Sequence, residues 1–236
     1  MLSSLLEILL PKLCPLCRDS DSPSLKTDGL CAHCLAGFKK VSKPVCSICG
    51  APFVSSSGPD HLCAKCIKTK RPFVKARSAL YYTDEGAEAI KRFKYHGVFS
   101  LKPAFDNIFY ALLDEFRDVD LIIPVPLHRR RLAHRGFNQS LILARLVAKR
   151  LNKKLDYTTL KRVRLTRPQT ELKGEERKRN VRGAFEVSSL SDYKDKKLLL
   201  VDDVYTTGST VSECARVLKR AGGVVSVLTL ARSARV

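Results

Sequence analysis

The chain has 236 residues, of which 44% are hydrophobic and 28% charged. That length accommodates one α/β domain and a small accessory module, and the ordinary apolar content excludes a disordered chain. No apolar run is long enough to span a bilayer. Residues 1–10 lack the basic start and cleavage pattern of a secretory signal, so we expect an amphipathic helix there and a cytoplasmic protein.

The net charge of +20 is unevenly distributed along the chain. Residues 1–75 hold 11 Lys/Arg against 5 Asp/Glu, a net +6. Eight thiolates on two Zn²⁺ would lower that to about +2. Residues 128–182 hold 18 Lys/Arg against 4 Asp/Glu, a net +14. This density favours polyanions such as diphosphate or nucleic acid, although any single cation there could simply belong to a solvated face.

The N-terminal third contains four Cys-x-x-Cys pairs. Each pair places two sulfurs on one side of a tight turn, and two pairs make a tetrahedral set of thiolate ligands for zinc. The pairs lie 13 residues apart within each couple, as in zinc ribbons, so we predict two structural zinc sites. A disulfide framework does not suit a cytosolic chain. We prefer sequential coupling to an interleaved one: Cys14, Cys17, Cys31 and Cys34 in one site; Cys46, Cys49, Cys63 and Cys66 in the other.

Strand and helix patterns alternate after about residue 72, which places a domain boundary between residues 1–75 and 76–236. Strands that alternate with helices predict an α/β domain with a mostly parallel sheet. Cys214 lies inside the last helix and is expected to be a buried apolar residue. The expected elements are strand 76–82, helix 85–95 capped by Asp84, helix 101–116 capped by Ser100, strand 120–125, a helix capped by Asn138, a basic loop 161–182, strand 197–204, helix 209–221 and strand 224–230.

The segment LLLVDDVYTTGST, residues 198–210, carries the strongest chemical signal. A buried strand delivers Asp202 and Asp203, and a turn rich in hydroxyl groups then opens a helix. Such a turn presents N–H groups at the positive end of the helix dipole and binds anions. The carboxylates can accept hydrogen bonds from the vicinal hydroxyls of a ribose. A surface turn with an N-cap would explain each residue singly but not their combination.

This segment resembles the phosphoribosyl-diphosphate motif of type I phosphoribosyltransferases. The resemblance implies that Asp202 and Asp203 hold the ribose 2′- and 3′-hydroxyls. It also implies a Mg²⁺ on the diphosphate and ribose oxygens. The turn that would wrap the 5-phosphate comprises Thr206, Thr207, Gly208, Ser209 and Thr210.

Two further segments sharpen the resemblance. PVPLHRRRLAHRGFNQS, residues 124–140, lies where that fold carries its diphosphate loop, and RPQTELKGEERKRNVRGAF, residues 167–185, lies where it has a mobile flap. With the N-terminal ribbons, they are similar to the ComF family, which is linked to DNA uptake in natural competence. The candidate diphosphate ligands are Leu127, Arg129, Arg130 and Arg131. His128 is either a general acid toward diphosphate or a plain cationic contact.

Three functions follow from these features. The first is a ComF-like DNA-uptake protein that binds phosphoribosyl diphosphate and single-stranded DNA, with competence-machinery proteins as possible partners. Phe137 and Phe185 would be its stacking platforms unless they belong to the core. The second is a conventional phosphoribosyltransferase acting on a nitrogenous base, with Lys94 and Tyr95 facing the acceptor or the solvent. The third is a non-catalytic adaptor. We prefer the first.

Overall fold

The computed structural model describes residues 13–19, 25, 29–54, 57–166, 174–188 and 193–233. The amphipathic helix expected over residues 1–10 lies outside these ranges. Within them, no helix has the length and apolar character needed to cross a membrane.

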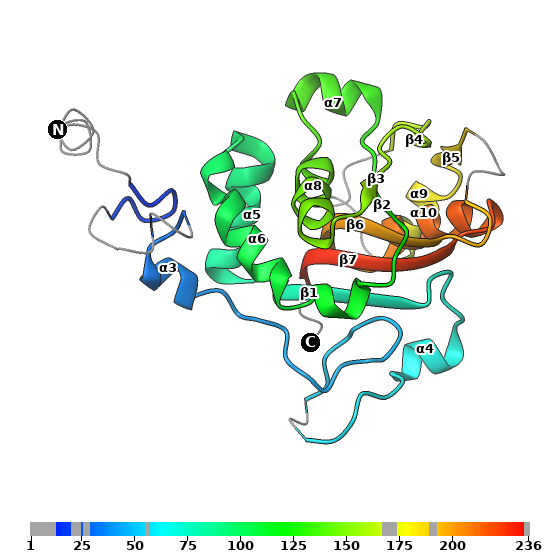
Figure 1. Ribbon diagram of the computed structural model, residues 1–236, viewed down its shortest axis with the longest axis horizontal. Coiled ribbons are helices and arrows are strands. Elements are labelled where there is room, and N and C mark those ends of the chain that lie inside the picture. Colours follow the sequence, from blue (N-terminus) through cyan, green and yellow to red (C-terminus); the bar gives the residue numbers. More distant parts are fainter. Residues whose placement is uncertain are drawn as a thin grey trace.

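A five-stranded parallel sheet forms the centre of the molecule (Figure 1). Its strand order is β1-β7-β6-β2-β3, so the two longest strands, β6 and β7, lie side by side in the middle. β4 and β5 form a separate antiparallel ribbon. The strands are β1 (Lys75–Tyr81), β2 (Leu121–Pro124), β3 (Lys154–Leu155), β4 (Leu160–Arg162), β5 (Phe185–Val187), β6 (Lys197–Tyr205) and β7 (Val224–Arg232).

Both faces of the sheet are buried, which is why β6 and β7 are apolar at consecutive positions. Leu199 and Val201 face one hydrophobic cluster, while Leu198 and Leu200 face the other, because successive side chains of a strand alternate between faces. The sheet therefore separates two cores, and both continue into the N-terminal cysteine region.

Helices cover the two faces unequally (Figure 1). Buried side chains of α5, α6 and α8 belong to the first core, and those of α10 belong to the second. Asn138 caps α8 by accepting a hydrogen bond from the Ser140 N–H at 3.0 Å, as the sequence predicts. The helices are α3 (Ala32–Ala36), α4 (Ala64–Lys68), α5 (Asp84–His96), α6 (Lys102–Tyr110), α7 (Arg129–Arg135), α8 (Gln139–Leu151), α9 (Gly174–Val181) and α10 (Ser209–Arg220).

The helix expected from Ser100 to Phe116 is divided. A 3-10 turn at Phe99–Leu101 precedes α6, and a second one at Leu113–Phe116 follows it. Pro103 lies in the first turn of α6, where its missing N–H group and fixed φ suit a helix start. The apolar periodicity is real, but it runs through three short elements.

Two other local expectations were wrong. Thr83 is the N-cap residue of α5, and Asp84 is its first residue, with the side chain paired to Lys39 at 2.7 Å. The basic segment 161–182 is not only a loop, because it contains the end of β4 and the whole of α9. Arg162 and Val181 are buried there despite the charged composition around them.

Candidate functional site

The eight cysteines of the four Cys-x-x-Cys pairs gather into two tetrads. The first contains Cys14, Cys17, Cys31 and Cys34; the second contains Cys46, Cys49, Cys63 and Cys66. Within each tetrad the sulfur atoms all lie within 4.8 Å of one another, as four ligands of one metal ion must. Sequential coupling is confirmed, and the donor set fits two structural zinc sites.

None of these eight cysteines forms a disulfide bond. The Cys17 and Cys31 Sγ atoms are 3.4 Å apart, and those of Cys49 and Cys63 are 3.7 Å apart. A disulfide bond measures about 2.05 Å. Burial opposes ionisation of Cys46, but the N–H groups of Cys63 and Cys49 lower its pKa to about 6. Cys46 thus favours the thiolate that zinc requires, whereas burial raises the pKa of Cys66 and raises that of Cys49 to about 12.

The anion-binding turn lies at the carboxyl end of β6, where the sequence places it. Gly208 is the N-cap residue of α10 and has φ +76°, a conformation that favours glycine. The Thr207 and Ser209 hydroxyls lie 2.7 Å apart. The N-terminus of a 12-residue helix therefore faces the end of the central strand.

Asp202 and Asp203 are both buried just before this turn. The Asp202 carboxylate accepts hydrogen bonds from the Ser140 hydroxyl and from the Asp203 N–H group, each at 2.9 Å. Burial and the neighbouring Asp203 charge raise the pKa of Asp202 to about 7.

Lys94 gives Asp203 a different environment. Its Nζ atom donates to the Asp203 Oδ2 atom at 2.6 Å. Although burial opposes ionisation of Asp203, the Lys94 charge lowers its pKa below the usual range. The two adjacent acids thus have opposite protonation tendencies.

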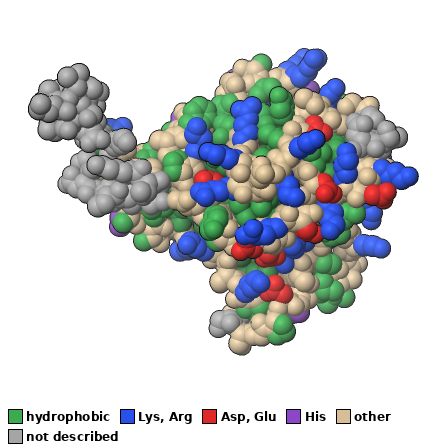
Figure 2. All heavy atoms as spheres, viewed as in Figure 1, with side chains coloured by type: hydrophobic (Ala, Val, Ile, Leu, Met, Phe, Trp, Pro, Cys, Tyr) green, Lys and Arg blue, Asp and Glu red, His purple; other side chains and the backbone are tan. Residues whose placement is uncertain are grey.

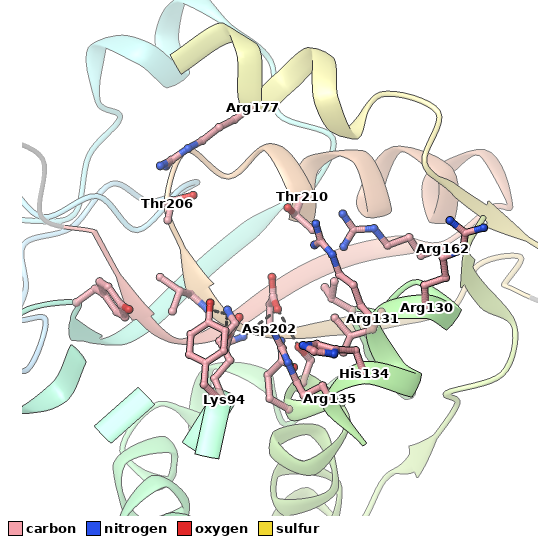
Figure 3. A pocket seen from close by; sticks show the side chains of 18 residues that line it. Lys94, Arg130, Arg131, His134, Arg135, Arg162, Arg177, Asp202, Thr206 and Thr210 are labelled. Atoms are coloured by element: carbon pink, nitrogen blue, oxygen red, sulfur yellow. Dashed lines mark hydrogen bonds and ion pairs between the residues drawn. The ribbon is translucent and has the colours of Figure 1, made fainter. Parts of the chain in front are cut away.

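A cavity of about 470 Å³ opens above the two carboxylates (Figure 3). Besides these acids, its polar wall is mostly cationic. The cationic side chains come from α5, α7, β4 and α9, which are distant in the sequence. They are Lys94, Arg130, Arg131, Arg135, Arg162 and Arg177. Such a cavity suits a ligand that combines a diol with several anionic oxygens.

Most predicted ligand residues line this cavity, including both acids. Leu127, Arg130 and Arg131 enter from the segment before α8, and Thr206 and Thr210 enter from the turn. Thr207, Gly208 and Ser209 form the turn without lining the cavity, and Arg129 is exposed outside it.

His128 is also absent from the cavity wall. Its Nδ1 atom accepts the Arg130 N–H group at 3.3 Å and so caps α7. The helix begins at Arg129, inside the segment expected to be a phosphate loop. This rotates His134 and Arg135 of the next turn into the cavity (Figure 3).

Arg162 is the least expected member of the cavity wall. It is 9% exposed, its Nη2 atom donates to the Thr166 hydroxyl, and its guanidinium lies 5.2 Å from the centre of the Phe185 ring. Its Nε atom is buried and has no hydrogen-bond partner among the described residues. Burial and the nearby Arg131 lower the pKa of Arg162 to about 10. A buried, positively charged guanidinium with an unused N–H donor favours an anionic ligand. In the sequence, Arg162 stands among many other Lys and Arg residues, and no local pattern distinguishes it from them.

The two phenylalanines considered as DNA platforms have structural roles. Phe185 is 2% exposed and belongs to the second core. Phe137 packs against Phe99 with ring centroids 5.0 Å apart, and also against Phe93. Phe185 is therefore inaccessible to a nucleobase, and Phe137 belongs to an aromatic cluster.

Tyr95 and the two N-terminal histidines are exposed. Tyr95 is 57% exposed and lies on the cavity wall, whereas Lys94 beside it is engaged by Asp203. His33 is exposed, and His61 stacks on Phe53 at 3.7 Å. With eight sulfurs available, neither histidine is needed as a zinc ligand.

Cys214 is fully buried in α10, as predicted.

Two family models match the chain. Residues 5–72 match a double zinc ribbon domain, and residues 138–235 match a phosphoribosyl transferase domain. The tetrads, the parallel sheet and the turn after Asp203 agree with this division. The molecule is thus a double zinc ribbon joined to a domain of the phosphoribosyltransferase fold.

Several curated relatives cover most of the chain. Competence protein F of Haemophilus influenzae is 33% identical over 83% of this chain and 86% of its own length. DNA utilization protein YhgH of Escherichia coli K12 is 31% identical over 96% and 99%, respectively. Competence protein ComFC of Bacillus subtilis is 28% identical over 86% and 84%. The chain therefore belongs to the ComF family.

Zinc analysis by mass spectrometry tests the assignment of the tetrads. Wild-type protein should carry two zinc ions per chain, and a Cys31→Ala/Cys34→Ala variant should carry one, because two thiolates cannot hold the first ion. Cys214→Ala is the matched control and should retain both ions. A tetrad variant that still holds two ions would contradict the assignment.

Replacing Asp202 with Asn tests its unusual pKa in the absence of ligand. An unfolded Asp ionises near pH 4, whereas the pKa of folded Asp202 is about 7. The free energy of unfolding of the wild type therefore decreases as the pH rises from about 4 to about 7. The Asn variant avoids this loss. It should match wild type at pH 4 and exceed its free energy of unfolding by roughly 1–3 kcal/mol at pH 8. Thermal unfolding across this range measures the difference.

Asp203→Asn is the matched control, because the pKa of Asp203 is lowered by Lys94. Its ionised form stabilises the folded protein above the unfolded pKa, and that stability is lost only as the pH falls through the folded value. The Asn variant should therefore be less stable than wild type at pH 8. Similar behaviour of the two variants would show that the acids do not have opposite environments.

Proposed function

We propose that this protein acts in DNA uptake by binding phosphoribosyl diphosphate in the cavity and single-stranded DNA on its basic surface, in the cytoplasm. The observation that carries the first part is the buried pair Asp202 and Asp203 between an anion-binding turn and a group of arginines. The family relatives named for competence and DNA utilization support the second part.

Each part of the ligand has a matching part of the cavity. The ribose 2′- and 3′-hydroxyls would donate to Asp202 and Asp203, and the 5-phosphate would lie on the turn at Thr206–Thr210. The diphosphate would lie against Arg130, Arg131 and Arg162, whose guanidinium groups bind phosphate oxygens well.

Two carboxylates beside a diphosphate also fit the oxygen-rich ligand set that Mg²⁺ prefers. A bound Mg²⁺ would neutralise charge that develops on the diphosphate. The Lys94–Asp203 ion pair uses one acceptor position of that carboxylate, so a ribose hydroxyl or Mg²⁺ would use its remaining lone pairs.

The chemistry that such a site supports is displacement at ribose C1. A nitrogen lone pair forms the new C1–N bond while the C1–O bond breaks, and diphosphate leaves with that electron pair. Arg131 and Arg162 would stabilise the departing charge, and the protein would otherwise act by positioning the reactants. Tyr95, on the cavity wall and 57% exposed, is a candidate contact for the acceptor.

Lys and Arg side chains spread over the whole face drawn in Figure 2 and are not gathered in one stripe. Arg129, Arg179 and Arg182 are exposed, and none of them lines the cavity. They can therefore contact a phosphate backbone without displacing the cavity ligand. This surface, and not Phe137 or Phe185, is where we place single-stranded DNA.

Calorimetric titration with phosphoribosyl diphosphate and Mg²⁺ tests the cavity. Wild type should bind, and an Asp202→Asn/Asp203→Asn variant should lose at least about tenfold in affinity, because two charged hydrogen-bond acceptors for the diol are gone. An Asp114→Asn/Asp118→Asn variant removes the same charge from exposed positions outside the cavity and should bind normally.

The outcomes separate the candidate functions. Binding with release of diphosphate when free bases are added would favour a conventional phosphoribosyltransferase. Binding without turnover under any acceptor would favour a non-catalytic adaptor. No binding by wild type would contradict the ligand assignment.

A salt titration of single-stranded DNA binding tests the basic surface. An Arg129→Gln/Arg179→Gln/Arg182→Gln variant should reduce the slope of log K against log salt by about 2, since each lost phosphate contact contributes roughly 0.7. Lys40→Gln/Lys43→Gln/Lys70→Gln removes the same charge from the ribbon region and should leave the slope nearly unchanged. An equal effect of both variants would contradict the location of this surface.

A further inference from the structure

Arg232, the last residue of β7, connects the second cysteine tetrad to the strand that precedes the anion-binding turn. Its side chain is 3% exposed. The Arg232 Nη1 atom donates to the Cys49 carbonyl at 3.0 Å, and the same guanidinium lies 5.2 Å from the centre of the Tyr205 ring. Tyr205 ends β6 and immediately precedes Thr206.

The Tyr205 side chain supports the turn from beneath. A Cβ atom added at Gly208 would lie 2.3 Å from the Tyr205 hydroxyl oxygen. The phenol ring therefore fills the space that a side chain at Gly208 would need. Because Gly208 has φ +76° and begins α10, the position of this ring determines how the turn enters the helix.

Arg71 also reaches this region. Its side chain is hydrogen-bonded to the Cys66 thiol and lies near Tyr205. A zinc ion with four thiolates has a formal charge of −2, which Arg71 and Arg232 together balance. The residues behind the turn therefore fit a loaded zinc centre.

In the part of the chain that the structure describes, the first tetrad has no such connection to the turn. Its buried cysteines belong to the core on the opposite face of the sheet, with residues of α5 and α6. Arg92 donates from α5 to the Pro15 carbonyl of that module. The two zinc centres therefore differ in what they support, although their ligand patterns are the same.

We propose that Arg232 and Tyr205 are positioning residues through which the second zinc centre holds the phosphate-binding turn in its binding conformation. The inference rests on the proposed function in treating the turn as the 5-phosphate site. It assigns to the second ribbon a role in ligand binding, whereas the buried cysteines of the first ribbon belong to the core on the opposite face of the sheet.

Two ligands that probe different parts of the cavity distinguish positioning from general damage. Ribose 5-phosphate reports on the turn, and inorganic diphosphate reports on Arg131 and Arg162. Tyr205→Leu and Arg232→Met should each weaken ribose 5-phosphate about tenfold and change diphosphate affinity less than about twofold, with both zinc ions retained. Tyr205→Phe keeps the ring and should restore wild-type binding.

Arg77→Met is the matched control for attachment of the second ribbon. Arg77 donates to the Ser47 carbonyl at 3.2 Å and pairs with Glu115 at 2.9 Å. Among the described residues, Arg77 makes no hydrogen bond to Tyr205. This variant should bind ribose 5-phosphate within about twofold of wild type. A tenfold loss here, or equal losses of both ligands in the Tyr205 variant, would overturn the proposal.

Amide hydrogen exchange supplies a readout that needs no ligand. Cys63→Ser, which removes a ligand of the second zinc ion, should speed exchange at residues 206–212. Cys17→Ser, in the first tetrad, should not. Unchanged exchange at this turn in Cys63→Ser protein that has lost one zinc ion would overturn the proposal. Failure of wild type to bind ribose 5-phosphate would instead contradict the proposed function, and the exchange result would still decide the coupling.

Discussion

The burial of two adjacent carboxylates at the end of the central strand is the constraint on which the site depends. Ionised groups are costly away from water unless hydrogen bonds or opposite charges compensate them. The fold supplies that compensation asymmetrically. Lys94 from α5 pairs directly with Asp203, whereas Asp202 accepts from two neutral donors, the Ser140 hydroxyl and the Asp203 N–H group. Asp203 therefore stays ionised, whereas the protonation of Asp202 depends on its surroundings. The arginines across the cavity complete a site whose two ends have opposite polarity.

The sequence predicts the elements of the α/β domain because their signals are local. Consecutive apolar residues before Asp202 require a strand with two buried faces, and equal Cys-x-x-Cys spacings favour sequential tetrads. The Lys94–Asp203 pair joins residues 109 positions apart, so no local pattern contains it. Arg162 was missed for another reason: its neighbours are charged and polar, and its burial is imposed by Phe185 and β5. His128 does not line the cavity, because α7 begins one residue later and the His128 ring caps that helix.

The cysteine region is joined closely to the rest of the protein. Each tetrad belongs to a different core, so the N-terminal segment passes from one face of the sheet to the other around β1 (Figure 1). On the way, Lys40 pairs with Leu80 as an isolated bridge, which covers part of the edge of β1. The domain boundary between residues 75 and 76 stays a prediction from the change in sequence pattern. Arg77 and Arg232 donate hydrogen bonds across it to carbonyls of the second ribbon.

The strand order has a consequence for synthesis of the chain. β7 follows every other strand in the sequence, yet it lies between β1 and β6. While the chain emerges from the ribosome, β1 therefore has no partner in the sheet until residues 224–232 are available. The ribbons can acquire metal long before that, but Arg232 reaches Cys49 only after the final strand inserts. Until then the edges of β1 and β6 stay open to wrong pairing, so a chaperone or rapid completion of translation would matter most at this late stage.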